Sequence, residues 1–438
     1  MLTAIVFLPA VGAIVMVLLA KNDRQVRFLS LLITLTVLVL VLVVWATIDL
    51  DDPNPQWVQR YQWISAFDVQ YYLGVDGLSA PLLGLTGLLG VAAVLVSWGI
   101  KHRTREFFFW LLLLQTGITG VFVSLDLLLF FMFWEVELVP MFLLISIWGS
   151  GRREYSAMKF LLYTMLSSGL MLAGMLVLYF SAGTFDMIAL RDAPPSIALI
   201  TAPGVFFLLL AAFAVKLPVW PFHTWLPDAH TDAPTAASVM LAGVMLKMGA
   251  YGIFRICISL FPEVARDYSD LLVTLAVVSV LYGAVMVFRQ HDLKRLIAYS
   301  SISHMGFVLL GIASLGQVGM TGAAMQMFAH GTITAMLFMV AGLVYEKAHT
   351  RHIPDLGGLV SRMPLLTIAF MIAGLAALGL PSMSGFVAEI LVFLGSFGVY
   401  REATILAMFA LVLSAGYILW TAQRVFFGPE KPRFTAIG

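Results

Sequence analysis

Apolar runs long enough to cross a lipid bilayer occupy nearly the whole sequence. A membrane-spanning helix needs about 20 apolar residues, and we expect about thirteen such spans. They lie at residues 2–20, 26–48, 75–99, 106–123, 125–148, 156–182, 203–222, 235–259, 269–288, 296–315, 318–345, 364–398 and 402–426. Of the 438 residues, 61% are hydrophobic and 11% are charged, which no soluble globular domain matches. The sequence predicts an all-α polytopic membrane protein with about 13–14 transmembrane helices.

Lysine and arginine are concentrated in alternate loops between these spans. The basic loops are residues 21–27, 101–105, 151–153, 289–295, 346–352 and 423–433, and the intervening loops near 50–72, 183–200, 260–268 and 399–401 hold few basic residues. Basic loops stay on the cytoplasmic side. We therefore expect the N-terminus on the outer side. The first run has no positive segment and no cleavage site, so we expect a retained helix and not a signal peptide.

Two spans carry internal breaks. Lys216 is followed by Pro218 and Pro221, and the long span 364–398 is interrupted by GLPSMSG at 379–385. Proline removes a backbone hydrogen bond and is tolerated at membrane depth only beside protein or water. The breaks fall fourth in spans 4–8 and fourth in spans 9–13, which predicts two inverted five-helix repeats. The predicted domains are 1–105 with helices 1–3, 106–259 with the first repeat and 260–438 with the second.

Seven ionisable residues lie well inside spans, mostly near the centre of their span. They are Glu135, Glu137, Lys216, Lys247, His304, His330 and Glu389. A charge at the bilayer centre costs about 2.5–3.5 kcal/mol on insertion scales, so such residues usually mark an ion pathway. Groups at one depth on different helices form a row parallel to the membrane, along which a proton could pass.

The acidic residues of the fifth span have competing interpretations. Glu135 is the natural partner of Lys216, although it could also make a structural hydrogen bond to a neighbouring helix. Glu137 lies two residues on, about 200° around the helix, so both carboxylates cannot face one axis. For Glu137 we keep two alternatives, contact with a neighbouring subunit or structural packing.

The remaining candidates differ in how specifically they indicate proton transfer. Lys247, in the small-residue string AGVMLKMGAYG, lies too deep to reach the surface, and the small residues indicate close helix contact. His304 and His330 suit a relay because their ordinary pKa is about 6.5, yet a lone buried histidine is often a core residue. Glu389 follows the second break, and His223 beside the first is a possible entry or exit group.

Composition excludes several classes of function. Cys257 is the one cysteine, so the chain has no disulfide framework, no four-cysteine iron–sulfur cluster and no CxxC redox pair. The net charge of +1 gives no case for nucleic acid. A b-type haem protein with His304 and His330 as axial ligands is an alternative that an absorption spectrum would test. A plain membrane scaffold is another, which the buried charges disfavour.

Six strings resemble the antiporter-like membrane subunits of respiratory complex I, over nearly the whole chain. They are DGLSAPLLGL, WEVELVPMFLLISIWG, KLPVWPFHTWLPDAHTDAPTAASVMLAGVMLKMGAYG, DLKRLIAYSSISHMGF, HGTITAMLFMVAGLVYEKAHTR and LPSMSGFVAEILVFLGSF. The long central string is also typical of multisubunit sodium/proton antiporters and membrane-bound hydrogenases. Glu389 is typical of the M-type branch (subunit 4). The other antiporter-like subunits of complex I usually have lysine at that position.

The resemblance implies a proton-translocating subunit of a complex I-type oxidoreductase, with a subunit of a sodium/proton antiporter or membrane-bound hydrogenase as the alternative. It implies a Glu135–Lys216 charge pair, Lys247 as central relay, His304 and His330 along the axis, and Glu389 as terminal group. No cofactor is expected in this chain; flavin, iron–sulfur clusters and quinone are expected in partner subunits, with NADH or ferredoxin as donor.

The resemblance also implies which membrane and partner subunits surround the chain, and that its final helix is missing. It places the chain beside other antiporter-like membrane subunits and a hydrophilic redox arm, in a bacterial plasma membrane or a thylakoid-type membrane. The family usually has a fourteenth helix, whereas this sequence ends near the end of the thirteenth span, so the final helix is expected to be missing.

Overall fold

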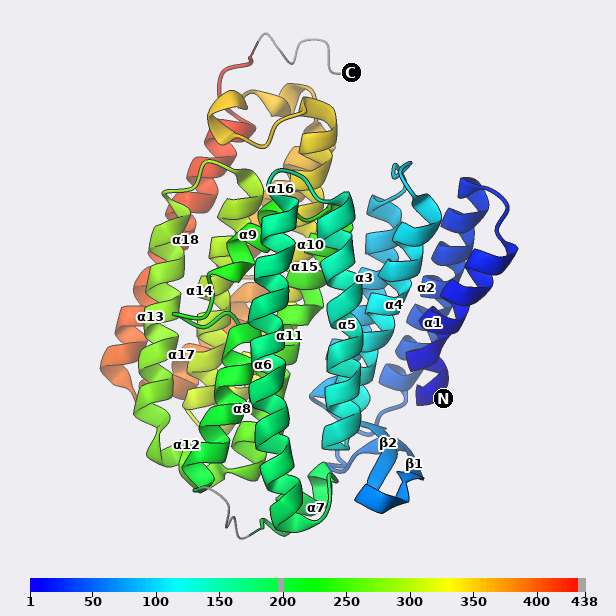
Figure 1. The fold of residues 1–438 in the computed structure, drawn as a ribbon. Helices are drawn as coiled ribbons and strands as arrows, with labels where there is room; N and C mark the ends of the chain where they lie inside the picture. The colour runs from blue at the N-terminus through cyan, green and yellow to red at the C-terminus, as the bar shows by residue number, and fades with distance from the viewer. Residues whose placement is uncertain (196–200, 432–438) are drawn as a thin grey trace. The chain divides into compact units, whose positions relative to one another are not determined.

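The computed structural model describes residues 1–195 and 201–431, which are mostly helical (Figure 1). Eleven helices in these ranges are long and apolar enough to cross a membrane. They are α1 (Leu2–Leu19), α2 (Asp23–Ala46), α3 (Ser79–Val96), α4 (Thr104–Val123), α5 (Leu127–Trp148), α6 (Arg153–Ala182), the helical run Thr235–Ile258, α13 (Ser269–Val287), α14 (Leu293–Ala313), α15 (Gln317–Ala348) and α18 (Arg401–Val425). Helices satisfy their own backbone groups in hydrocarbon, so long apolar runs form them. The predicted all-α polytopic fold is confirmed.

Shorter helices accompany these spans. Three are apolar: α8 (Ala202–Lys216), α16 (Pro364–Ala377) and α17 (Ser384–Phe397). Three more are α7 (Met187–Asp192), α9 (Trp225–Asp232) and α12 (Pro262–Asp267). The predicted loops 183–200 and 423–433 extend into residues 196–200 and 432–438, which lie outside the described residues.

The two predicted helix breaks are present. α8 ends at Lys216, before the prolines, and the chain turns before α9 begins. α16 ends at Ala377 and α17 begins at Ser384, which matches the interruption predicted at 379–385. Gly379 adopts φ +73° in this break, a left-handed conformation that glycine reaches at no steric cost. The inverted-repeat relation between the halves stays a prediction.

The chain divides into two compact units. Unit 1 comprises Met1–Leu217 and Val244–Asp267, and unit 2 comprises Pro218–Gly243 and the chain from Tyr268 onward. The run Thr235–Ile258 consists of α10 (Thr235–Met240), a π-helical segment (Leu241–Met245), α11 (Leu246–Gly252) and a second π-helical segment (Ile253–Ile258). The predicted domains 1–105, 106–259 and 260–438 stay predictions.

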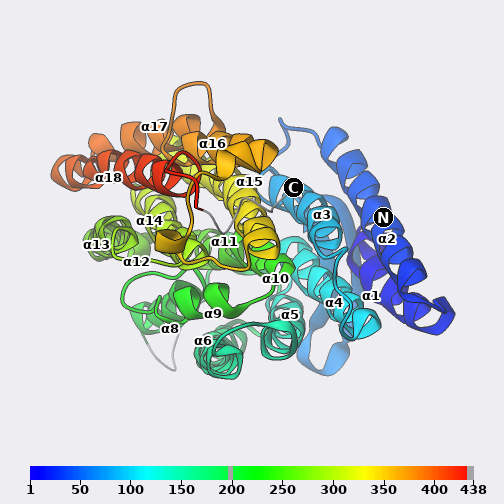
Figure 2. The same ribbon diagram turned by 90° about the horizontal axis from the view of Figure 1, so that it is seen from above.

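In unit 1, α4 packs against α1 and α5, while α6 packs against α5 and α8 (Figure 2). Two glycines allow close approach of these helices. A Cβ on Gly117 of α4 would lie 2.8 Å from the backbone nitrogen of Glu137. A Cβ on Gly249 of α11 would lie 2.6 Å from the backbone nitrogen of Leu217, at the end of α8. The helix contact predicted near Lys247 is therefore confirmed.

A β-hairpin occupies one end of unit 1, where the sequence predicted only an external loop. Strands β1 (Gln56–Ile64) and β2 (Val69–Val75) pair antiparallel, with Tyr61 opposite Tyr71. β1 is mostly exposed and β2 mostly buried. The backbone nitrogen of Leu125, just before α5, donates to the carbonyl of Tyr72. The hairpin therefore anchors the start of α5.

Unit 2 is built around α14. This helix packs against α13 on one side and α15 on the other, and its most apolar stretch is completely buried (Figure 2). α15 also contacts both halves of the broken span, α16 and α17. Polar side chains on α14, α15 and α17 therefore face a common interior.

Candidate functional site

An ion pair lies inside unit 1, between α5 and α8. The Nζ of Lys216 donates to the Oε1 of Glu137, and both side chains are buried almost completely. The ammonium also lies 5.3 Å from the ring centre of Trp134 and 5.6 Å from that of Phe160. Lys216 is the last residue of α8, where the helix dipole favours a positive charge. The break after α8 thus places a lysine and a carboxylate together in the apolar interior.

The predicted pairing of Lys216 with Glu135 was wrong. Glu135 is only half-buried and lies on the face of α5 that carries Met132, 40% exposed, and Val139, 50% exposed. Glu137 faces α4 instead, at the place where Gly117 leaves room for the α5 backbone. The two carboxylates point to different sides, as helix geometry requires, but the inward one is Glu137. The alternatives considered for Glu137 did not include this pairing.

Lys247 is fully buried in α11. The seven residues of α11 lie between two π-helical segments, which the sequence did not reveal. Such segments are rare and are often found at functional sites. α11 packs against α8, the helix that ends at Lys216. Both interior lysines of unit 1 therefore belong to adjacent helices.

In unit 2, the structure brings together His304, His330 and Glu389, three of the residues that the sequence singles out. The Nδ1 of His304 on α14 lies 3.4 Å from the Oε1 of Glu389 on α17. The ring centres of His304 and His330 are 5.6 Å apart. All three side chains are buried and line one small cavity. The cluster lies immediately after the break between α16 and α17.

Two further residues complete this cluster, and the sequence prediction missed both. The Nε2 of Gln326 lies 3.4 Å from the Nδ1 of His304. Gln326 precedes His330 by four residues, so helical spacing on α15 could have indicated it. A Cβ on Gly379 would lie 2.5 Å from the Oε2 of Glu389, so the helix break itself makes room for the carboxylate.

His223, the predicted entry or exit group, lies in the turn before α9. It is buried, and its ring packs edge-on against Tyr282 of α13, with 4.8 Å between ring centres. Nearby, Lys294 at the start of α14 is buried and donates to the carbonyl of Ala233, 2.7 Å away. Arg295 pairs with Asp228 at 2.9 Å. These contacts tie the segment around α9 to α14.

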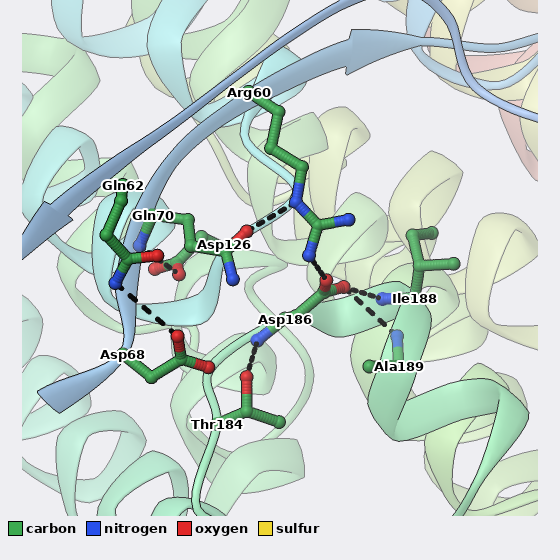
Figure 3. A network of polar contacts seen from close by, with 9 residues as sticks. All are labelled: Arg60, Gln62, Asp68, Gln70, Asp126, Thr184, Asp186, Ile188 and Ala189. Atoms are coloured by element: carbon green, nitrogen blue, oxygen red, sulfur yellow. Dashed lines mark hydrogen bonds and ion pairs between the residues drawn. The ribbon is translucent and has the colours of Figure 1, made fainter. Parts of the chain in front are cut away.

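A polar network at the hairpin end of unit 1 holds the starts of α5 and α7 (Figure 3). Arg60 of β1 pairs with Asp186 at 2.6 Å, and Asp186 caps α7. Asp126 caps α5 and accepts the backbone N–H of Gln70 in β2 at 3.0 Å. Burial raises the pKa of Asp126, and three backbone N–H donors offset part of that rise. The network fixes the end of the helix that carries Glu137.

A multi-pass helical protein that buries lysine and carboxylate at one helix break, and histidine and carboxylate at another, defines the class of ion-translocating membrane proteins. The chain belongs to the NADH:quinone oxidoreductase/Mrp antiporter transmembrane family, whose profile matches residues 124–414. The resemblance stated from the sequence is thereby confirmed.

Relatives match almost the whole chain. NAD(P)H-quinone oxidoreductase chain 4 1 of Synechococcus elongatus is 43% identical over 98% of this chain and 82% of its own length. NADH-quinone oxidoreductase subunit M of Rhodobacter capsulatus is 41% identical over 98% of this chain and 86% of its own. A chain of respiratory complex I from Thermus thermophilus matches with a TM-score of 0.90 at 31% identity, over 98% of this chain and 90% of that one.

A more distant structural match extends the fold beyond complex I. A chain of the Mrp complex from Dietzia matches with a TM-score of 0.88 at 24% identity, over 98% of this chain and 80% of that one. At this identity the likeness concerns the fold alone.

Proposed function

We propose that this chain is a proton-translocating membrane subunit of a complex I-type oxidoreductase, in which quinone reduction by partner subunits drives proton movement. The observation that carries the proposal is the buried Lys216–Glu137 pair at a helix break. Breaking a buried ion pair leaves an uncompensated charge and costs about 3–5 kcal/mol. Such a pair is therefore an effective store for the coupling energy.

In this proposal the redox chemistry belongs to other subunits. Flavin and quinone are held by partners, and so are the iron–sulfur clusters, which the single cysteine of this chain cannot ligate. The chain lies beside other antiporter-like subunits in a bacterial plasma membrane or thylakoid-type membrane. The N-terminus faces the outer side, because the basic loops alternate along the chain.

The coupling step is an electrostatic one. Two unit charges about 4 Å apart interact by about 4 kcal/mol at an effective dielectric constant of about 20. A disturbance that separates Lys216 from Glu137 removes an electrostatic interaction energy of this size from the interior of unit 1. About 1.4 kcal/mol changes proton occupancy tenfold. A change of that size in the potential at Lys247, in the adjacent helix α11, would move a proton onto or off its side chain.

The cluster of His304, His330 and Glu389 is the second proton-holding group of the proposal. His304 Nδ1 lies 3.4 Å from Glu389 Oε1, so a shift of a few tenths of an ångström in either side chain would bring imidazole and carboxylate into hydrogen-bonding distance. The neighbouring His330 ring extends the cluster along α15. The proposed relay comprises Lys247, this cluster and Glu389 as its terminal group, with His223 as an entry or exit group.

Replacement of either interior lysine tests the proposal in the assembled complex. We expect Lys216→Met and Lys247→Met to lower proton translocation, and quinone reduction with it, by at least about tenfold. Lys159→Met is the matched control, because Lys159 lies half-buried near the start of α6 and packs on Tyr155. Full pumping in an assembled Lys247→Met complex would contradict the proposal.

A further inference from the structure

A stripe of polar side chains leads from Lys247 toward the hairpin end of unit 1. Lys247 and Tyr251 are four residues apart in α11, so they share one helix face, and Arg255 lies four residues further on in the π-helical segment. Tyr251 is completely buried, and its hydroxyl donates to the carbonyl of Phe122 at 3.1 Å. The Nε of Arg255 in turn donates to the Tyr251 hydroxyl at 3.2 Å. These hydrogen bonds join Tyr251 to Arg255, one turn beyond the interior Lys247.

Arg255 is held by Asp76 at the outer end of this stripe. The guanidinium donates to the Oδ2 of Asp76 at 2.5 Å, and the two side chains are only 12% and 16% exposed. The Oδ1 of Asp76 accepts the backbone N–H groups of Leu78 and Ser79, at 3.1 and 3.0 Å. Burial alone would raise the pKa of Asp76, but the charge of Arg255 and these hydrogen bonds hold it below its ordinary value. The carboxylate is therefore ionised and locked to the start of α3.

We propose that Arg255, held by Asp76, is a gate that keeps protons from passing between Lys247 and the hairpin end of unit 1. The inference rests on the proposed function, because a gate is needed only if Lys247 carries a proton. A guanidinium keeps its proton at any physiological pH, so it cannot relay one. Held between Asp76 and the Tyr251 hydroxyl, the guanidinium fills the outer end of this polar face with a group that neither takes up nor releases a proton.

A purely structural role for the pair makes a different prediction. A structural link between α3 and the second π-helical segment would affect assembly and stability when removed. It would not create a passive proton pathway that depends on Lys247. The gate predicts such a pathway, since removal of the guanidinium opens the stripe without changing its inner end.

The experiment measures passive proton leak in liposomes that contain the assembled complex, without electron donor, under an imposed pH gradient. We expect Arg255→Gln to raise the leak about tenfold, the factor that corresponds to about 1.4 kcal/mol of barrier. Adding Lys247→Met should return the leak to the wild-type level. Arg103→Gln is the matched control, because Arg103 forms an exposed ion pair with Glu106 in the same unit.

Two further variants make every outcome informative. The double variant Asp76→Asn, Arg255→Gln leaves no unpaired buried charge and serves if Arg255→Gln does not assemble. Arg255→Lys retains an ion pair with Asp76 and should keep the low leak. A wild-type leak in assembled charge-removed variants, or a leak unaffected by Lys247→Met, overturns the gate. Intact pumping in Lys247→Met alone would instead overturn the proposed function, whatever the leak.

Discussion

Lys216 contacts Glu137, two residues beyond the carboxylate that the family resemblance indicates, and both partners are almost fully buried. The pairing depends on a close approach of three helices. α8 ends at Lys216, α5 presents Glu137, and Gly117 of α4 leaves room for the α5 backbone. Glu135 lies on the more exposed face of α5. The two acidic residues of one short string thus have different environments, and their replacement should have different effects.

Glu137→Gln should reduce proton translocation and quinone reduction by at least about tenfold, because it leaves Lys216 as an unpaired buried charge. Glu135→Gln is the matched control on the same helix and should retain most of the activity. Both rates are measured in membrane vesicles after assembly has been checked on native gels. A stronger defect in Glu135→Gln than in Glu137→Gln would show that the relevant carboxylate is that of Glu135.

A double-mutant cycle isolates the energy of the pair. We expect Lys216→Met and Glu137→Gln each to destabilise the protein by about 3–5 kcal/mol. The double variant should lose less than the sum, with a coupling energy of about 2–3 kcal/mol, because it leaves no unpaired charge. Thermal unfolding in detergent provides the measurement. Strict additivity would mean that the two groups do not interact.

Gly379→Ala should disturb Glu389 directly. Alanine in the left-handed conformation costs about 1–2 kcal/mol, and its Cβ would lie 2.5 Å from the Oε2 of Glu389. We expect lower stability and a proton-translocation defect. Gly398→Ala is the control, since its Cβ would have no neighbour within 4 Å at the other end of α17. Equal effects of the two substitutions would contradict the proposed crowding of the carboxylate.

The stability contribution of Asp76 should depend on pH with a defined sign. Its folded pKa is below the ordinary value of about 3.9, so the contribution is fully present above about pH 4 and is lost as the pH falls through the folded pKa. In Arg255→Met, burial dominates and raises that pKa, so stability should fall as the pH rises from about 4 to about 6. The unfolding temperature in detergent across this range tests the prediction, and parallel pH profiles for wild type and variant would refute it.

Most of the fold follows from hydropathy together with proline and glycine positions. Apolar runs must become helices in lipid, so the spans agree with the structure within a few residues, and the break at 379–385 was readable from its glycines and proline. The hairpin was missed, because β1 is mostly exposed and offers little apolar alternation. The π-helical segments were missed as well, since their extra residue has no compositional signal.

The sequence predicts which residues belong to the site better than it predicts which of them contact one another. Burial cost alone identifies Lys216, Lys247 and Glu389 as interior charges. It does not say which of Glu135 and Glu137 faces inward, because that depends on the rotation of α5 against α4 and α8. The contacts of Gln326, and of Arg255 with Asp76, join residues far apart in the chain. Such contacts follow from tertiary packing, which one sequence does not reveal.

The π-helical segments on both sides of α11 have a mechanical consequence. Each contains a wide turn that holds one surplus residue while its backbone stays hydrogen-bonded. If a wide turn migrates along the helix by exchange of bonding partners, the residues it passes rotate by about 100°. Lys247 lies between two such turns, so its helical segment could then rotate about the helix axis while its backbone N–H groups stay hydrogen-bonded in the hydrocarbon.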